Sequence, residues 1–151
     1  MNNRKFINAD GKIVANKLSS PDAIHTRADP PREPYMQIDF AEAYFKRGIT
    51  KYALRDYDGA LADYTKSIHL EPAHAQPYCF RGRMKSDLKD YHGGIDDFTK
   101  ALELNPDYAE VYFDRAIAFL GVGKKNEALA DLQKAKGAGI QISQDILEQC
   151  K

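Results

Sequence analysis

The sequence contains no tryptophan, only two cysteines and no excess of charge of either sign. Lys and Arg number 22, and Asp and Glu also number 22, so the formal net charge is zero. Binding to nucleic acid or to an anionic membrane depends on clustered positive charge, so this balance argues against both kinds of partner. No stretch reaches the roughly 18 apolar residues of a membrane span, and residues 1–18 lack the apolar core of a signal peptide. These absences predict a cytoplasmic protein.

The sequence has neither closely spaced cysteines nor catalytic motifs, and this argues against metal binding and against catalysis. Cys79 and Cys150 lie far apart in the sequence, so we expect two free thiols, no metal site and no cofactor. His69 and His74 flank Pro72, which breaks the helical spacing that a metal pair needs. The sequence has no nucleophile motif and no glycine-rich phosphate loop. We therefore expect a protein that is not an enzyme.

The composition is that of one soluble domain. The chain has 151 residues, of which 43% are hydrophobic and 29% are charged. This balance supplies enough apolar surface for a packed core and argues against wholesale disorder.

Self-comparison reveals a period of 34 residues. Segments 41–74 and 75–108 share 14 of 34 residues, and segment 109–142 continues the pattern with 6 identities to the second segment. The recurring columns are Tyr44/Tyr78/Tyr112, Arg47/Arg81/Arg115, Gly48/Gly82/Ala116, Ala60/Gly94/Ala128, Asp63/Asp97/Asp131, Tyr64/Phe98/Leu132 and Lys66/Lys100/Lys134. A fixed period of this length is typical of repeat proteins built from stacked units.

Each unit predicts two helices. Apolar and small residues recur at three- and four-residue intervals in both halves, separated by a segment of turn character. The expected helices are 40–53, 57–70, 74–87, 91–104, 108–121 and 125–137. Pro72 and Pro106 end the second helices of the first two units, because proline disfavours helical geometry in the preceding residue. Asp39 and Asp107 are expected as N-caps of the helices that follow them.

Two further columns suggest how the helices meet. The small residues of the Gly48 column and the Ala60 column predict close contact between the two helices of each unit, since bulky side chains would hold them apart. Arginine recurs beside these packing positions, which favours a structural role for Arg47, Arg81 and Arg115 over an anion-binding ladder. The Asp63 and Lys66 columns lie three residues apart and predict local ion pairs on exposed helix faces.

The run AYFKRGITKYALRDYDGALADYTKSIHLEP resembles a tetratricopeptide repeat, with its aromatic, glycine, alanine and proline landmarks at the family's spacing. The resemblance covers Phe40–Lys151, and unit three departs from it at Lys125 and Ile140. It implies an all-α, right-handed superhelical solenoid of three helical hairpins. Residues 143–151 resemble the capping helix that closes such an array. The domain is therefore expected to span 40–151, preceded by an arm of residues 1–39.

The resemblance also implies a function. In this family the first helices of the units line the concave side, and a groove of this kind receives a peptide or helix from a partner. The side chains that packing does not use on these helices are expected to bind a partner with apolar anchors, and they are Phe45, Ile49, Tyr52, Cys79, Phe80, Arg83, Phe113 and Ile117. A contiguous apolar strip of this kind marks a binding surface. We expect a non-catalytic adaptor or scaffold for protein–protein interaction.

The sequence argues against one class of partner, the acidic C-terminal tails of heat-shock chaperones. Family members that hold the acidic C-terminal tails of heat-shock chaperones use a carboxylate clamp of Lys, Arg and Asn side chains. The matching positions here are Phe45, Ile49, Phe80, Glu110 and Asp114. None of the five retains the clamp residue, and two carboxylates would repel an acidic tail. We expect no binding of such tails.

The arm carries four of the seven prolines and two apolar pairs, Phe6-Ile7 and Ile13-Val14, on either side of the turn signal Asp10-Gly11. These pairs predict a hairpin, and residues 19–34 predict an extended linker. The arm could be a flexible extension, a lid over the groove, or a contact to a second copy. The alternative function is accordingly self-association into a homo-oligomer, with the arm occupying the groove in cis or in trans.

Overall fold

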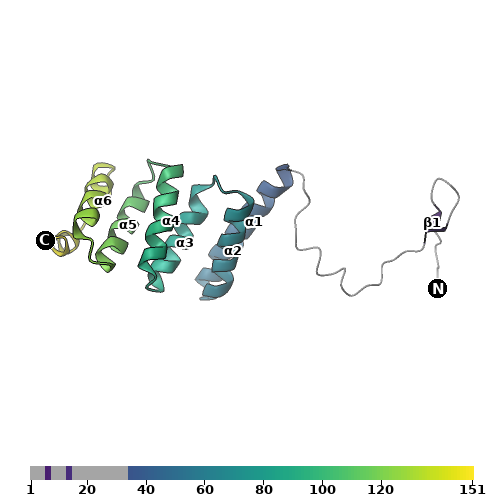
Figure 1. The fold of residues 1–151 in the computed structure, drawn as a ribbon, viewed down its shortest axis with the longest axis horizontal. Coiled ribbons are helices and arrows are strands. Elements are labelled where there is room, and N and C mark those ends of the chain that lie inside the picture. The colour runs from purple at the N-terminus through teal and green to yellow at the C-terminus, as the bar shows by residue number, and fades with distance from the viewer. Residues whose placement is uncertain (1–5, 8–12, 15–33) are drawn as a thin grey trace. The chain divides into compact units, whose positions relative to one another are not determined.

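The computed structural model describes residues 6–7, 13–14 and 34–151 (Figure 1). The chain divides into two units, residues 1–32 and residues 33–151. In the first unit, strands β1 (Phe6–Ile7) and β2 (Ile13–Val14) pair antiparallel. The two apolar pairs of the predicted hairpin therefore form its strands. The predicted turn, the linker up to residue 33 and the placement of the arm over the groove lie outside the described residues.

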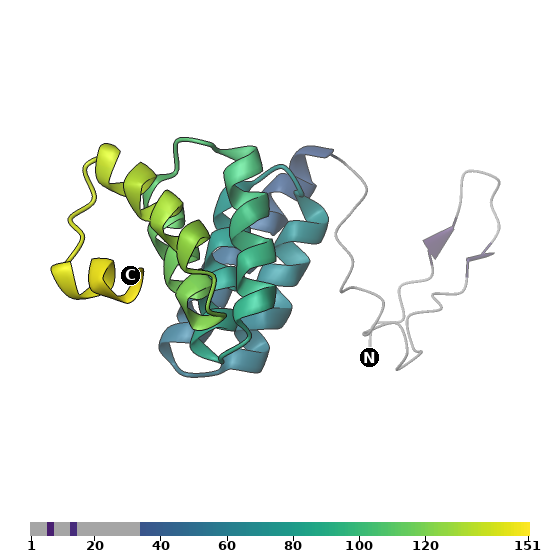
Figure 2. The same cartoon turned by 60° about the vertical axis from the view of Figure 1, so that its left-hand side comes forward.

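The second unit consists of helical hairpins stacked in a row (Figure 1). The hairpins are α1–α2, α3–α4 and α5–α6, and a short helix α7 follows them (Figure 2). The helix bounds are α1 Pro34–Ala53, α2 Tyr57–Leu70, α3 Ala75–Asp87, α4 Tyr91–Leu104, α5 Ala109–Gly121, α6 Lys125–Gly137 and α7 Gln144–Gln149. The all-α solenoid of three hairpins plus a capping helix that the repeat predicts is confirmed. Within the described residues, no helix is long and apolar enough to cross a membrane.

The first helix begins earlier than the repeat pattern predicts. α1 starts at Pro34, whose fixed backbone angle and missing N–H suit the first position of a helix. Asp39 therefore lies inside α1, and its predicted role as N-cap is wrong. The same prediction is wrong for Asp107, because the residue that caps α5 is Tyr108.

Aspartates do cap helices, but at the second helix of a hairpin. The side chain of Asp56 accepts a hydrogen bond from the Gly59 N–H at 3.0 Å, and Asp90 accepts one from the Gly93 N–H at 2.9 Å. Each pair satisfies one of the N–H groups that the start of a helix leaves without a backbone partner. The capping aspartates fix where α2 and α4 begin, and so set the length of the turn inside the first two hairpins.

Small residues allow the two helices of a hairpin to touch, as predicted. A Cβ atom added to Gly82 would lie 3.2 Å from the Gly94 carbonyl oxygen, and one added to Gly94 would lie 3.0 Å from the Gly82 carbonyl oxygen. The ring of Phe98, which is buried, covers the same contact. In the third hairpin Ala116 and Ala128 occupy these positions and are fully buried. Backbone contact at this point brings α3 and α4 close along their length.

The aspartate column is buried, so its predicted placement on exposed helix faces is wrong. Each aspartate instead accepts two hydrogen bonds from the arginine of the first helix in its own hairpin, Asp63 from Arg47, Asp97 from Arg81 and Asp131 from Arg115, with donor–acceptor distances of 2.6–2.9 Å. A carboxylate can be buried when a guanidinium satisfies both of its oxygens. The predicted structural role of the arginine column therefore agrees with the geometry.

These arginines also contact the preceding hairpin. The Nη1 atom of Arg81 donates to the Thr65 hydroxyl at 3.3 Å, and that of Arg115 donates to the Thr99 hydroxyl at 3.0 Å. The Asp63 carboxyl has a pKa below its usual value, chiefly because Arg47 hydrogen-bonds to its charged form. The arginine column thus binds the two helices of each hairpin together and ties each later hairpin to the one before it.

The last hairpin is covered by α7. Ala116, Ala128 and Leu132 form a buried cluster, and the residues packed against it from the C-terminal segment are Ile142, Ile146, Leu147 and Cys150. A stacked array leaves one apolar face open at its end, so a terminal helix of this kind keeps that face from water.

Candidate functional site

The first helices of neighbouring hairpins contact one another along one side of the array. The contacts join Phe45 to Phe80, Tyr52 to Asp87, and Arg83 to Asp114. Six predicted binding residues lie along this side and keep exposed surface, and we call them the first-helix surface: Ile49, Tyr52, Phe80, Arg83, Phe113 and Ile117. Ile117 is the most open of the aliphatic members, with 38% of its surface exposed.

Two of the eight predicted binding residues belong to the core instead. Phe45 is 7% exposed and Cys79 is fully buried. Both occupy the fifth position of their unit, where the side chain inserts between two consecutive first helices. In helical projection this position lies beside the exposed positions, so the spacing alone did not separate it from them. Neither residue offers surface to a partner.

The junction of α1 and α3 is aromatic. The rings of Phe45 and Phe80 meet edge to face with centroids 5.2 Å apart, and Ile49 packs into the same cluster. At the far end of this junction the Tyr52 hydroxyl donates to the Asp87 carboxylate. That hydrogen bond, together with partial burial, raises the pKa of Tyr52 to about 12. Tyr52 is therefore protonated and held in place at all physiological pH values.

The junction of α3 and α5 is ionic. The Nε atom of Arg83 donates to the Asp114 carboxylate at 2.5 Å, and its guanidinium lies 5.5 Å from the centre of the Phe80 ring. Burial raises the pKa of Asp114, and the nearby carboxylates of Glu110 and Asp87 raise it further, against the lowering effect of Arg83. The single cation at this junction is thus already paired with a carboxylate.

The sequence analysis did not find the Arg83–Asp114 and Tyr52–Asp87 contacts. Their separations are 31 and 35 residues, which differ from the 34-residue period by minus three and plus one. An offset of minus three places the partner nearly one helical turn from the equivalent position, and an offset of plus one places it next to that position, so both pairs join equivalent helices of neighbouring hairpins. A search for complementary pairs at such offsets would have found both contacts.

Burial makes Cys79 a poor nucleophile. It raises the pKa of the Cys79 thiol to about 11, and the neighbouring side chains include Arg83, Asp114 and Tyr108. Cys150 is partly exposed, and both thiols are free. The two free thiols that the sequence predicts are confirmed.

Alkylation of the native protein should therefore modify Cys150 first. We expect iodoacetamide at pH 8 to label Cys79 at least roughly a hundredfold more slowly than Cys150, since only the thiolate reacts and the reagent cannot reach a buried sulfur. Intact mass over time should show one adduct, with the second appearing only on addition of denaturant. Equal labelling of both thiols in the native protein would contradict the buried placement.

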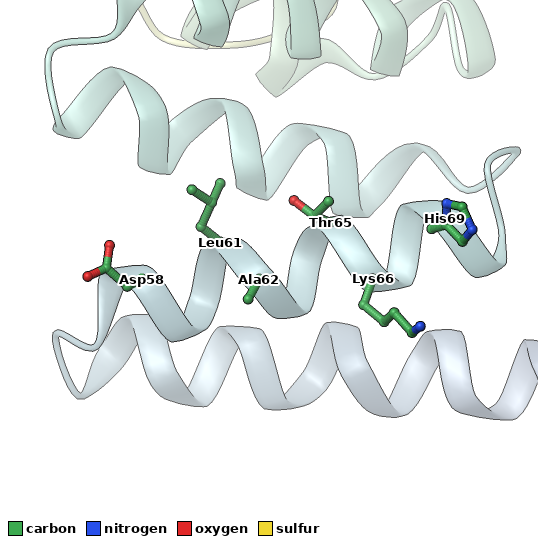
Figure 3. A pocket seen from close by; sticks show the side chains of 6 residues that line it. All are labelled: Asp58, Leu61, Ala62, Thr65, Lys66 and His69. Carbon is green, nitrogen blue, oxygen red and sulfur yellow. The ribbon is translucent and has the colours of Figure 1, made fainter. Parts of the chain in front are cut away.

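Hollows also lie elsewhere on the helical unit, among them the following three. The largest of the three, about 500 Å³, is lined by residues of α2 alone: Asp58, Leu61, Ala62, Thr65, Lys66 and His69. Figure 3 shows these side chains in a row along the helix, with Asp58 at one end and His69 at the other. Eleven residues of helix separate the two by about 16 Å, which is far beyond hydrogen-bond reach. The carboxylate and the imidazole therefore cannot act together on one substrate atom.

The other two of these three hollows are smaller. One of about 280 Å³ is lined by Phe40, Ala43, Tyr44 and Arg47, and one of about 330 Å³ lies beside Tyr112 and Lys134. Across the described part of the chain, no group of three or more His, Cys, Asp or Glu side chains could hold a metal ion. The second of these hollows also contains Asp107, but the Lys134 Nζ lies over the face of the Tyr112 ring, 5.0 Å from its centre, and not at its hydroxyl. The first-helix surface is therefore the stronger candidate site.

Comparison with protein families gives three matches, all to models described as the tetratricopeptide repeat. They cover residues 41–74, 75–108 and 98–130. The first two coincide with the first two predicted repeats. A search of curated proteins returns no match.

Solved structures similar to this chain are tetratricopeptide repeat domains and larger proteins that share the fold. The repeat domain of OM64 from Arabidopsis has a TM-score of 0.72 at 23% identity, with 76% of this chain and 97% of that chain covered. The second such domain of human RPAP3, solved with the HSP70 peptide SGPTIEEVD, has a TM-score of 0.68 at 24% identity, with 78% and 98% covered. Yeast Tom70 has a TM-score of 0.67 at 29% identity, with 74% of this chain and 23% of that chain covered.

Proposed function

Because the chain belongs to the tetratricopeptide repeat family, we propose that it is a non-catalytic adaptor that binds a peptide or helix of another protein on its first-helix surface. The observation that carries this proposal is the row of partly exposed apolar side chains, Ile49, Phe80 and Ile117, one on each first helix. Stable packing does not require a row of exposed apolar residues on three consecutive helices. Such a row is typical of a surface that a partner covers.

The rigidity of this surface supports the same function. Contacts between the first helices hold Tyr52, Phe80 and Arg83 in place before any partner arrives. A surface that is ordered in advance loses little conformational entropy on binding, so more of the contact energy appears as affinity. Tyrosine and arginine also rank among the residues that most often dominate binding energy at interfaces.

Acidic chaperone tails are not the proposed partner. The peptides in three of the similar structures end in EEVD and carry negative charge. The present chain has Glu110 and Asp114 where such tails would need cationic side chains, and Arg83 is already paired. Like charges that face each other across an interface weaken binding by several kcal/mol. We therefore propose a different class of partner.

The test replaces Ile117 and compares captured proteins. We expect Ile117→Glu to weaken binding of the true partner by roughly 30-fold, because a carboxylate in an apolar contact loses hot-spot burial and adds a desolvation cost. Affinity capture would use the wild type, Ile117→Glu and the control Leu129→Glu, with quantitative mass spectrometry as the readout. Leu129 is 36% exposed on α6, a second helix, so it matches Ile117 in exposure and chemistry.

The proposal predicts at least one protein that the wild type and Leu129→Glu capture and that Ile117→Glu does not. Identical captured sets for all three proteins would overturn it, provided that circular dichroism shows all three to be folded. Self-association, the alternative from the sequence, predicts a mass that rises with concentration in light scattering and falls back in the Ile117→Glu variant.

A further inference from the structure

The first-helix surface combines an apolar half with an acidic half. At the junction of α1 and α3 its exposed groups are aliphatic and aromatic, namely Ile49 and Phe80. At the junction of α3 and α5 they include the carboxylates of Asp87 and Glu110. The two halves lie side by side, because Arg83 of the ionic junction contacts the Phe80 ring of the aromatic one.

The formal charges on this side of the array do not cancel. Lys46 pairs with Glu42 at 2.7 Å, and Arg83 pairs with Asp114 at 2.5 Å, so each of these pairs is neutral. Among the described residues, neither Asp87 nor Glu110 has a cationic partner within ion-pair distance. Both carboxylates lie close enough to Asp114 to act on it electrostatically. The surface therefore carries about two uncompensated negative charges beside its apolar row.

We propose that the partner is a basic amphipathic peptide, with apolar side chains packed on Ile49, Phe80 and Ile117 and a Lys or Arg next to them that pairs with Glu110. This inference rests on the proposed function and adds the charge of the partner. Charge complementarity is the reason: a cation placed there gains an unpaired carboxylate, whereas an anion meets two carboxylates. An amphipathic peptide of this type presents both features at once, an apolar face and flanking basic residues.

Neighbouring groups define where the cation fits. Asp114 is occupied by Arg83, so a partner cation at that point would have to displace a short ion pair. Glu110 lies one helical turn before Asp114 on α5, is exposed and has no cation bound. Asp87 holds the Tyr52 hydroxyl and contributes long-range attraction. Glu110 is therefore the residue whose replacement should change the preference for partner charge most directly.

The experiment uses a phage-displayed library of random 16-residue peptides selected on the whole chain. We expect the selected peptides to be enriched in Lys and Arg over Asp and Glu, beside apolar residues. Their affinity, measured by fluorescence anisotropy with synthetic copies, should fall at least tenfold for Glu110→Lys and should weaken with added salt. The matched control is Asp96→Lys, the same charge reversal at an exposed position of α4, and it should leave the affinity unchanged.

The outcomes separate this inference from the proposed function. Peptides that lose binding with Ile117→Glu but show no basic enrichment, or that bind Glu110→Lys as well as wild type, would overturn the inference and leave the binding surface intact. Peptides whose affinity Ile117→Glu does not change would overturn the proposed function, and the inference with it. A library that yields no binders above background would count against both.

Discussion

Asp97→Asn is expected to lower the free energy of unfolding by about 3 kcal/mol, because it removes the negative charge that pairs with two neighbouring cations. Asp97 is 4% exposed and lies in the central hairpin. It accepts hydrogen bonds from Arg81 Nε at 2.8 Å and from Arg81 Nη2 at 2.6 Å, and the Lys85 Nζ lies 2.9 Å away. Asparagine keeps the shape but presents an NH2 group toward a guanidinium, so both cations lose their counter-charge in a partly buried site.

Urea unfolding followed by circular dichroism measures this change. The neighbouring substitution Asp96→Asn provides the control, because the same chemical change occurs on the exposed face of the same helix. We expect a shift of less than about 0.5 kcal/mol for the control, as for most surface substitutions. Equal midpoints for the two variants would show that the buried pair contributes nothing to stability.

Gly82→Leu should lower the free energy of unfolding by about 3 kcal/mol, the upper end of what overpacking a core costs. The Cβ atom alone would lie 2.8 Å and 2.9 Å from two carbons of the Phe98 ring and 3.2 Å from the Gly94 carbonyl oxygen. The ring is 1% exposed and cannot swing out to make room. The two helices of the hairpin would have to separate, and the Arg81–Asp97 contact bridges the same pair of helices.

The same substitution at Gly137 tests this explanation. Nothing lies within 4 Å of the Cβ position of Gly137, the last residue of α6. Leucine there is expected to raise stability by several tenths of a kcal/mol, since it forms helix better than glycine by about 0.7 kcal/mol. A loss of stability at Gly137 as large as that at Gly82 would mean that close helix contact is not the cause.

Much of the fold is predictable because a repeat reports each structural requirement several times. The Gly48 and Ala60 columns indicate where the two helices of a hairpin touch. The need for a small residue at this contact is visible in each unit of the one sequence. The helix bounds from α2 to α6 agree with the predicted ranges to within one residue for the same reason. The start of α1 has no such repetition, and only Pro34 indicates it.

The ion pairs and the binding surface were harder to predict, since both depend on contacts between helices. Asp63 has a lysine three residues later and an arginine sixteen residues earlier, and spacing on one helix indicates only the lysine. Only the turn between α1 and α2, which reverses the chain, brings Arg47 opposite Asp63. Likewise Phe45 and Cys79 share a helix face with exposed residues, and their burial comes from the next hairpin in the stack.

The buried arginine–aspartate pair also affects how such arrays change in length. Both members belong to one hairpin, so a duplicated or deleted 34-residue segment carries its cation and anion together. Insertion of a hairpin between two others would then leave no buried aspartate without its arginine. The ion pair of Arg83 with Asp114 joins two different hairpins, so an inserted hairpin would separate the two residues. A change in the number of hairpins therefore preserves the buried Arg–Asp pairs, whereas an insertion between α3–α4 and α5–α6 separates Arg83 from Asp114 and alters the first-helix surface.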